Sequence, residues 1–318
     1  GGATPLALKS LDISFNPIGD EGGATILNAL APPEYVQTLG DFDNDHGEDG
    51  NGRTEGESDT PPGSERRTRA PSYNDRIKAL RMAGCRLGKA CAKRLSDVAK
   101  FNLSLQRVEL SFNPGMRRSE VRRLVSSLRL YHTPWREVGL AQSGAGNEIL
   151  GAFARFTSDE GSCLQNLLLQ GNDYTSSGVR RLAHALERNE ALLNLDLSGN
   201  PLGDQGASHL ARGLAHNGTL LHLILTDCGL STAALRPLAA LLAHNRALMT
   251  LNLAENALTK LPSDDHGGTL QGGGRDIFHI GTVDETRRWD GWEAFSRALR
   301  ENGALRALDL TGVELGPR

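Results

Sequence analysis

A pattern of apolar residues recurs along the chain. Its clearest copy is Leu192-x-x-Leu195-x-Leu197-x-x-Asn200, with apolar residues at positions one, four and six. Related copies start at residues 8, 77, 105, 135, 164, 192, 220, 248 and 305. Six of the eight gaps between starts are 28 to 30 residues, and the others are 69 and 57. We interpret the two long gaps as insertions into an array of about nine repeats.

Each copy predicts a short strand followed by a helix. Leu195 and Leu197 alternate with other residues, as in a strand with one buried face. Small and apolar residues then recur at helical spacing over 204–214. Asp20 and Asp204 stand where a side chain would cap the first turn of the helix that they begin, and Ser231 has a comparable place. Asparagines follow the helices, and we expect them to end these helices in the left-handed conformation: Asn102, Asn189, Asn217, Asn245 and Asn302.

The ninth position of each copy carries a polar or small side chain. It is Asn in several copies, as at Asn113 and Asn200, and Cys at Cys85 and Cys228. A side chain that turns inward there would satisfy backbone groups where the strand ends. We therefore predict a structural role for Cys85 and Cys228 rather than a catalytic or metal-binding one.

Strand plus helix at this spacing resembles the ribonuclease-inhibitor subtype of leucine-rich repeats. The resemblance implies an α/β solenoid, a right-handed βα horseshoe with a concave parallel sheet and convex helices, over a single array 1–318. The family includes ribonuclease inhibitor, Ran GTPase-activating proteins, the sensor regions of NOD-like receptors, and cytoskeletal and axonemal proteins. The shared motif specifies the scaffold and does not choose among these functions.

Composition narrows the classes of partner. Of the 318 residues, 38% are hydrophobic and only 5% aromatic, so the core must consist mainly of Leu, Ala, Ile and Val. The net charge of -3 offers no overall basic surface, and we expect neither nucleic acid nor a membrane as partner. The four cysteines form no CxxC pair, which argues against zinc and favours a reducing, cytoplasmic location. We expect no cofactor and no metal.

The two insertions and the chain ends lie outside the regular pattern. Residues 31–72 hold ten acidic residues against four arginines, and we predict that this acidic insertion is disordered. The Gly-rich insertion 260–288 has no Gly-Lys-Ser/Thr, so it is not a phosphate loop. We expect Trp289 and Trp292, which follow it, to pack in the core. The first copy of the repeat starts at residue 8, and no closing helix follows the copy that starts at residue 305. Since solenoids normally need polar caps at both ends, this predicts a longer chain or a larger assembly.

Signatures of catalysis are missing from the sequence. It has no GxSxG, HExxH, P-loop or kinase motif, and its nine histidines are scattered. The sequence therefore favours a non-catalytic scaffold or adaptor that binds a partner protein through its concave face.

The candidate partner-binding surface is a stripe of apolar residues next to the strands. Leu193, Leu221 and Met249 precede three successive strands, and Leu168 and Ile224 extend the stripe on outward strand positions. With His222 beside Leu221, the candidate residues are Leu168, Leu193, Leu221, His222, Ile224 and Met249. A contiguous apolar patch on an otherwise polar face is typical of an interaction site.

Two alternatives remain open from the sequence. A Ran-type GTPase-activating protein would offer an arginine from a loop, and Arg117 and Arg118 follow Asn113-Pro114 at a strand-to-helix loop. The other alternative is the ligand-sensing repeat region of a NOD-like or other signalling receptor. A nucleotide-binding module elsewhere in the same chain would favour the receptor.

Overall fold

One parallel sheet runs the length of the molecule. The structure, a computed structural model, describes residues 8–31, 74, 76–131, 133–159, 161–259 and 283–313. Within these described residues nine strands pair in chain order, so each of them pairs with its neighbours in the sequence. They are β1 (Ser10–Asp12), β2 (Ala79–Arg81), β3 (Arg107–Glu109), β4 (Glu137–Gly139), β5 (Asn166–Leu168), β6 (Asn194–Asp196), β7 (His222–Ile224), β8 (Thr250–Asn252) and β9 (Ala307–Asp309).

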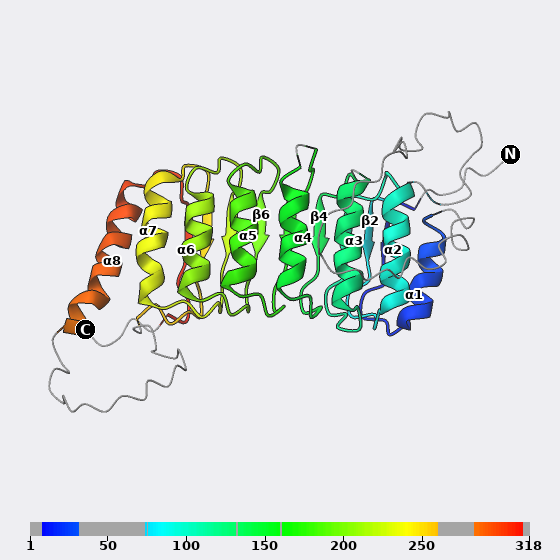
Figure 1. Cartoon of the computed structure of the whole chain (residues 1–318), viewed down its shortest axis with the longest axis horizontal. Helices are drawn as coiled ribbons and strands as arrows, with labels where there is room; N and C mark the ends of the chain where they lie inside the picture. The colour runs from blue at the N-terminus through cyan, green and yellow to red at the C-terminus, as the bar shows by residue number, and fades with distance from the viewer. Residues whose placement is uncertain are drawn as a thin grey trace, which may run out of the picture.

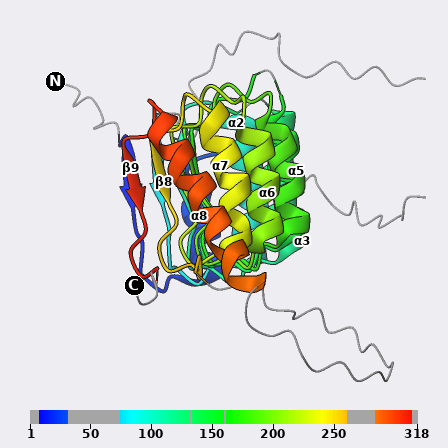
Figure 2. The same ribbon diagram turned by 90° about the vertical axis from the view of Figure 1, so that its left-hand side faces the viewer.

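The helices form a second layer along one face of this sheet (Figure 1). They are α1 (Gly19–Asn28), α2 (Lys89–Phe101), α3 (Arg118–Leu130), α4 (Asn147–Thr157), α5 (Ser176–Leu186), α6 (Gly203–Leu214), α7 (Leu235–His244) and α8 (Val283–Glu301), with a short 3-10 turn, η2 (Thr232–Ala234), before α7. Viewed along the array, the strands lie on one side and the helices on the other (Figure 2). The described helices thus leave the opposite face of the sheet uncovered; we call it the open face.

The leucines of the repeating pattern fill the space between the two layers. Leu195, at the centre of β6, is fully buried, while its neighbours Asn194 and Asp196 are half-buried on the open face. The register joins equal positions of successive copies, as in the pairs Leu167↔Leu195 and Leu195↔Leu223. The predicted α/β solenoid with a parallel sheet and helices on one side is confirmed.

A ladder of inward-pointing side chains closes the end of each strand. Asn200 donates from Nδ2 to the Leu197 carbonyl (2.8 Å), and its Oδ1 accepts from the backbone N–H of Asn172 in the preceding repeat (2.8 Å). At the same position Cys228 donates from Sγ to the Leu197 carbonyl (3.3 Å), and burial raises the pKa of this thiol to about 12. Cys85 is also fully buried. Both thiols have the structural surroundings that the sequence predicted.

The asparagines after the helices form a second ladder, and their predicted left-handed conformation is wrong. Asn245 is extended, with φ -75° and ψ 132°. Its Nδ2 donates to the carbonyls of Leu214 (2.7 Å) and Asn217 (2.9 Å), and its Oδ1 accepts from the N–H groups of Ala247 and Leu248. The side chain thus satisfies backbone groups of two repeats, and this requires the extended backbone.

The aspartates that were expected to cap their own helices cap the next repeat instead. Asp20 lies within the first turn of α1, and its carboxylate accepts from the N–H groups of Gly88, Ala90 and Cys91 at the start of α2. Asp204 similarly accepts from the backbone N–H and the hydroxyl of Ser231. The prediction for Ser231 is confirmed, because its Oγ accepts from the Ala233 N–H (3.2 Å).

The region around the second insertion differs from the prediction. Helix α8 already begins at Val283, so the predicted insertion 260–288 ends too late. Residues 283–289 contain neither Gly nor Pro, which permits the earlier helix start. Trp292 packs against the core and donates from Nε1 to the Leu258 carbonyl (3.1 Å), as expected. Trp289 is exposed, so its predicted core position is wrong. Residues 32–73 and 260–282, which hold the predicted acidic and Gly-rich tracts, lie outside the described residues.

Helices α5 and α6 approach each other closely at Gly213. A Cβ atom there would overlap the carbonyl oxygen of Ala183, a backbone atom that a rotamer change does not remove. We therefore expect Gly213→Ala to lower the free energy of unfolding by about 1–3 kcal/mol, as overpacking does. Urea denaturation measures the loss, and Gly218→Ala is the control because a Cβ there meets nothing within 4 Å. Equal stability of the two variants would contradict this contact.

No helix among the described residues is long and apolar enough to span a membrane.

Candidate functional site

The open face presents side chains in rows, because the strands are aligned in register. One row comes from the first residue of each strand and another from the third. With no described helix on this face, these rows and the loops that enter the strands are accessible to a partner (Figure 2). All six predicted partner-binding residues lie on this face or at its edge, and each is half-buried.

From β3 to β8 the row of first residues is polar, and from β3 to β6 it is linked across the strands. Arg107 Nε lies 3.8 Å from Glu137 Oε2, and Asn166 donates from Nδ2 to the same carboxylate (3.5 Å). Asn194 then donates from Nδ2 to Asn166 Oδ1. His222 occupies the next place in this row, in register with Asn194. His222 therefore belongs to a polar row that borders the apolar residues.

The row of third residues separates two of the predicted apolar residues. Leu168 on β5 and Ile224 on β7 both pair with Asp196 on β6, which lies between them. Asp196 accepts from Gln170 Nε2 (2.7 Å) and from Ser198 Oγ (2.6 Å), so its carboxylate is held on this face. The structure consequently places Leu168 apart from the other apolar residues of the stripe.

Leu221 and Met249 come together at the edge where the chain enters β7 and β8. They line a shallow hollow of about 490 Å³ together with small residues of the loops before β7, β8 and β9. Leu193 lies on the adjacent rung, since its carbonyl accepts from the Leu221 N–H (2.9 Å), but it does not line the hollow. The apolar centre of the candidate surface is thus the Leu221–Met249 hollow.

Two cations border this hollow. Arg246 and Arg306 are among its lining residues, and both are exposed. Arg246 donates from Nη1 to the Leu242 carbonyl (3.3 Å), and its other guanidinium nitrogens make no hydrogen bond among the described residues. The remaining lining residues are small: Gly218, Ala247, Gly303 and Ala304. An apolar floor with a cationic rim is the chemical character of this site.

The two loop arginines have different surroundings. Arg117 is the exposed residue before α3, in an extended conformation (φ -67°, ψ 148°). Arg118 is the first residue of α3, and its Nε donates to the Gly144 carbonyl of the next repeat (3.0 Å). Its guanidinium also lies against Gly146. Arg118 therefore helps to join two repeats, whereas Arg117 has no such contact among the described residues.

Sequence reasoning missed an exposed pair of aromatic residues near the N-terminal end. Phe15 and Phe112 are 71% and 43% exposed, and both have a positive φ, near +60°. Their ring centroids are 6.0 Å apart across Gly84, the corresponding residue of the repeat between them. Aligning the repeats would have revealed the pair, because Gly171 and Gly199 occupy this left-handed position in later copies.

Metal-ligating side chains do not converge in the described part of the chain, where no group of three or more His, Cys, Asp or Glu could hold an ion.

The matching family model supplies independent support for the repeat assignment. A model described as leucine-rich repeat matches residues 7–27 and 188–211. These segments include β1 with most of α1, and β6 with the beginning of α6. The fold is that of a leucine-rich-repeat solenoid. The match and the strand register do not specify a subtype of this repeat.

Comparisons with whole proteins add little to this assignment. Among solved structures, the leucine-rich repeats are similar to leiomodin-1 actin-binding site 2, at 14% identity and a TM-score of 0.32, over 66% of this chain and 88% of that one. They are also similar to a chain of the TLR13–ssRNA13 complex, at 14% identity and a TM-score of 0.36, over 76% of this chain and 33% of that one. No curated protein matches. At these values neither structure bears on the partner of this chain.

Proposed function

We propose that this protein is a non-catalytic adaptor that binds a partner protein on the open face of its sheet, at the Leu221–Met249 hollow. The observation that supports the proposal is the pairing of two apolar side chains from adjacent repeats in an accessible hollow. Leucine-rich repeats form extended surfaces on which such contacts accumulate. Burying one apolar side chain of a partner there would contribute about 1.5–3 kcal/mol.

The rim of the hollow suggests the chemistry of the partner segment. Arg246 and Arg306 border the apolar floor, and guanidinium groups pair well with carboxylates. The matching segment is an extended peptide in which an apolar side chain stands beside acidic residues. The apolar contact would supply affinity, and the charges would orient the segment and speed its association.

A double substitution tests the hollow directly. We expect Leu221→Asp with Met249→Asp to leave the fold intact, since both side chains are half-buried at the edge of the sheet. The double variant should fail to capture a partner that the wild type captures from lysate of its source organism. The carboxylates of the two new aspartates would lie where an apolar side chain of the partner must enter. Mass spectrometry of tagged pull-downs measures the loss, and circular dichroism verifies the fold.

The control carries the same chemical change at a distant exposed leucine. Leu103 is 67% exposed in the loop after α2, so Leu103→Asp should keep the partner. Unaltered capture by the double variant, or equal loss in both proteins, would refute the hollow as the binding site.

Reversing the rim charges tests the partner's chemistry separately. We expect Arg246→Glu with Arg306→Glu to weaken binding of the captured partner at least tenfold at low salt, with a smaller difference at high salt. Surface plasmon resonance over a salt series measures both effects. An affinity independent of the charge reversal would exclude an acidic segment and leave only the apolar contact.

The GTPase-activating and receptor alternatives gain no support from the described residues. Arg118 donates a hydrogen bond to the Gly144 carbonyl of the next repeat, and a single exposed arginine such as Arg117 is an ordinary surface feature.

A further inference from the structure

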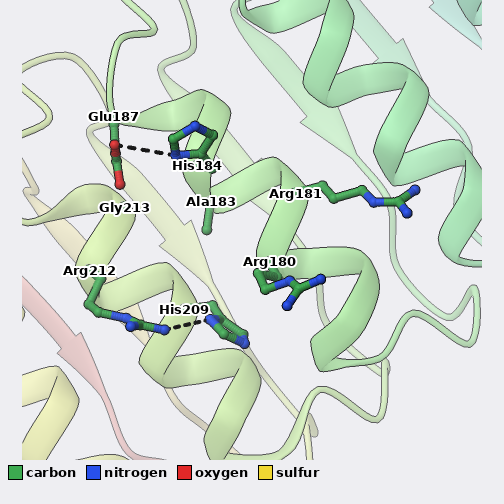
Figure 3. Close-up of a pocket in the computed structure, with 8 residues that line it drawn as sticks. All are labelled: Arg180, Arg181, Ala183, His184, Glu187, His209, Arg212 and Gly213. Carbon is green, nitrogen blue, oxygen red and sulfur yellow. Dashed lines mark hydrogen bonds and ion pairs between the residues drawn. The ribbon is translucent and has the colours of Figure 1, made fainter.

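A basic groove lies between α5 and α6, on the helical side of the molecule and away from the open face (Figure 3). It has a volume of about 410 Å³. The close contact of Gly213 with the Ala183 carbonyl brings the two helices together at this place. Because the floor is formed by these small residues, the long side chains of Arg180 and Arg212 line the groove from opposite helices.

His209 lies between these two arginines. Arg212 donates from Nη2 to His209 Nδ1 (2.8 Å), so this nitrogen carries no proton and the imidazole is neutral. Arg180 lies on the other side of the ring (Figure 3). Burial, followed by the positive charges of Arg212 and Arg180, lowers the pKa of His209. Both guanidinium groups are therefore near the imidazole.

The two arginines lack acidic partners among the described residues. Neither Arg180 nor Arg212 forms an ion pair within the described part of the chain, and both are exposed. The acidic groups nearby lie beside other side chains. Glu187 lies 3.4 Å from His184, and Asp204 accepts two hydrogen bonds from Ser231. The centre of the groove thus presents two permanent positive charges that no described carboxylate neutralises.

We propose that Arg180, His209 and Arg212 bind a phosphate monoester, carried on a phosphorylated side chain of a partner protein. A phosphoserine or phosphothreonine has a charge of about -1.5 to -2 near neutral pH, which matches two guanidinium groups better than a single carboxylate does. Guanidinium forks also fit the geometry of phosphate oxygens. The groove is larger than a phosphate, which leaves room for the residues that flank the modified side chain.

The acidic groups at the borders of the groove favour a single phosphate over a polyanion. Glu187 lines one end, and Asp204 borders the adjoining hollow that shares His209 and Arg212. A nucleic-acid strand has a charge on every nucleotide and would meet these carboxylates. A single phosphate flanked by uncharged residues would not bring further negative charges close to Glu187 and Asp204. This site is separate from the open face, so it does not depend on the adaptor proposal.

Protonation of His209 should be linked to binding. A phosphate dianion near the imidazole favours the charged ring, so binding raises the pKa of His209 and takes up a proton. The other charged groups facing this region are Arg181, His184 and Glu187 on α5 and Asp204 on α6, while η2 and α7 contribute the uncharged Ala233 and Pro237. We expect affinity to rise as the pH falls from about 7.5 to 6.5, and to decline below about 6, where the phosphate loses its second charge.

The test uses the full chain and a short peptide, Gly-Gly-phosphoserine-Gly-Gly, with the unphosphorylated peptide, inorganic phosphate and a ten-nucleotide RNA as comparisons. NMR signals of the imidazole rings report binding, and His209→Asn identifies the His209 signal. We expect saturable binding of the phosphopeptide with an upward shift of the His209 pKa. Arg180→Ala and Arg212→Ala should each weaken this binding at least tenfold.

Arg188→Ala is the matched control, because Arg188 is an exposed arginine two residues after the end of α5 that does not line the groove. It should keep at least half of the affinity. Equal binding of the unphosphorylated peptide, equal loss in Arg188→Ala, or no change in Arg180→Ala and Arg212→Ala would overturn the proposal. Tighter binding of inorganic phosphate would assign the site to a free ion, and tighter binding of the RNA would assign it to nucleic acid. Either result would overturn a phosphoprotein partner.

Discussion

Asn200→Ala will lower the free energy of unfolding by about 3–5 kcal/mol, because it leaves the buried backbone N–H groups of Asn172 and Tyr174 without acceptors. The Asn200 side chain is fully buried. Its Oδ1 accepts from the N–H groups of Asn172 (2.8 Å) and Tyr174 (3.1 Å), and its Nδ2 donates to the carbonyls of Leu169 and Leu197. Alanine makes none of these four bonds. The carbonyls of Leu169 and Leu197 keep donors in Asn172 Nδ2 (3.1 Å) and Cys228 Sγ (3.3 Å), but the N–H groups of Asn172 and Tyr174 have no other acceptor among the described residues.

Two measurements check this expectation. Urea denaturation gives the loss of stability, and amide hydrogen exchange should show faster exchange at the Tyr174 N–H, which loses its acceptor. Asn200→Cys is the matched control, since Cys228 occupies the same position in the next repeat and donates to the Leu197 carbonyl. We expect the cysteine variant to lose at least about 1 kcal/mol less than the alanine variant, because a thiol retains one weak donor. A loss below about 1 kcal/mol in Asn200→Ala would show that the ladder is not a major source of stability.

Asn245→Gly will destabilise the protein by about 2–4 kcal/mol, and this result separates two roles of the residue. Glycine would be tolerated or favoured if Asn245 ended α7 in the left-handed conformation. The structure instead shows an extended residue whose side chain makes four hydrogen bonds. Glycine loses all four, and the carbonyls of Leu214 and Asn217 then have no side-chain donor.

The neighbouring residue supplies the control for chain flexibility. Arg246 is exposed, and the Leu242 carbonyl to which it donates also accepts from Asn302 Nδ2 (2.6 Å), so Arg246→Gly should cost little more than the entropy of an added glycine, about 0.5–1 kcal/mol. Thermal and urea unfolding of both variants measure the difference. A stability of Asn245→Gly equal to or above that of the wild type would restore the left-handed role and exclude the second ladder.

Much of the scaffold could be predicted from the sequence because its determinants are local and repeated. Leu195 and Leu197 alternate within a few residues, and this alternation predicts a strand with one buried face. The near-constant spacing of the copies then places successive strands side by side and parallel. The buried thiols of Cys85 and Cys228 were predictable for the same reason, since they replace an asparagine at an equal position of the repeat.

The candidate surface was predictable only in part. The sequence identified Leu193, Leu221 and Met249 as a stripe, but the shape of the hollow depends on loops from three repeats. Asp196 separates Leu168 from Ile224 only because β6 lies between β5 and β7. The acidic insertion and the Gly-rich segment stay as predictions, because they lie outside the described residues.

The sequence by itself determined the order of strands and helices, the composition of the core and the inward position of the ladder residues, because each depends on spacing within one repeat. Only the tertiary structure decided which groups those side chains contact. Asp20 caps the helix of the following repeat, Asn245 bonds to carbonyls of the preceding one, and Arg180 lines the same groove as His209 from the neighbouring helix. These contacts join residues about one repeat apart, and their distances depend on how the repeats stack, which no local pattern of residues encodes.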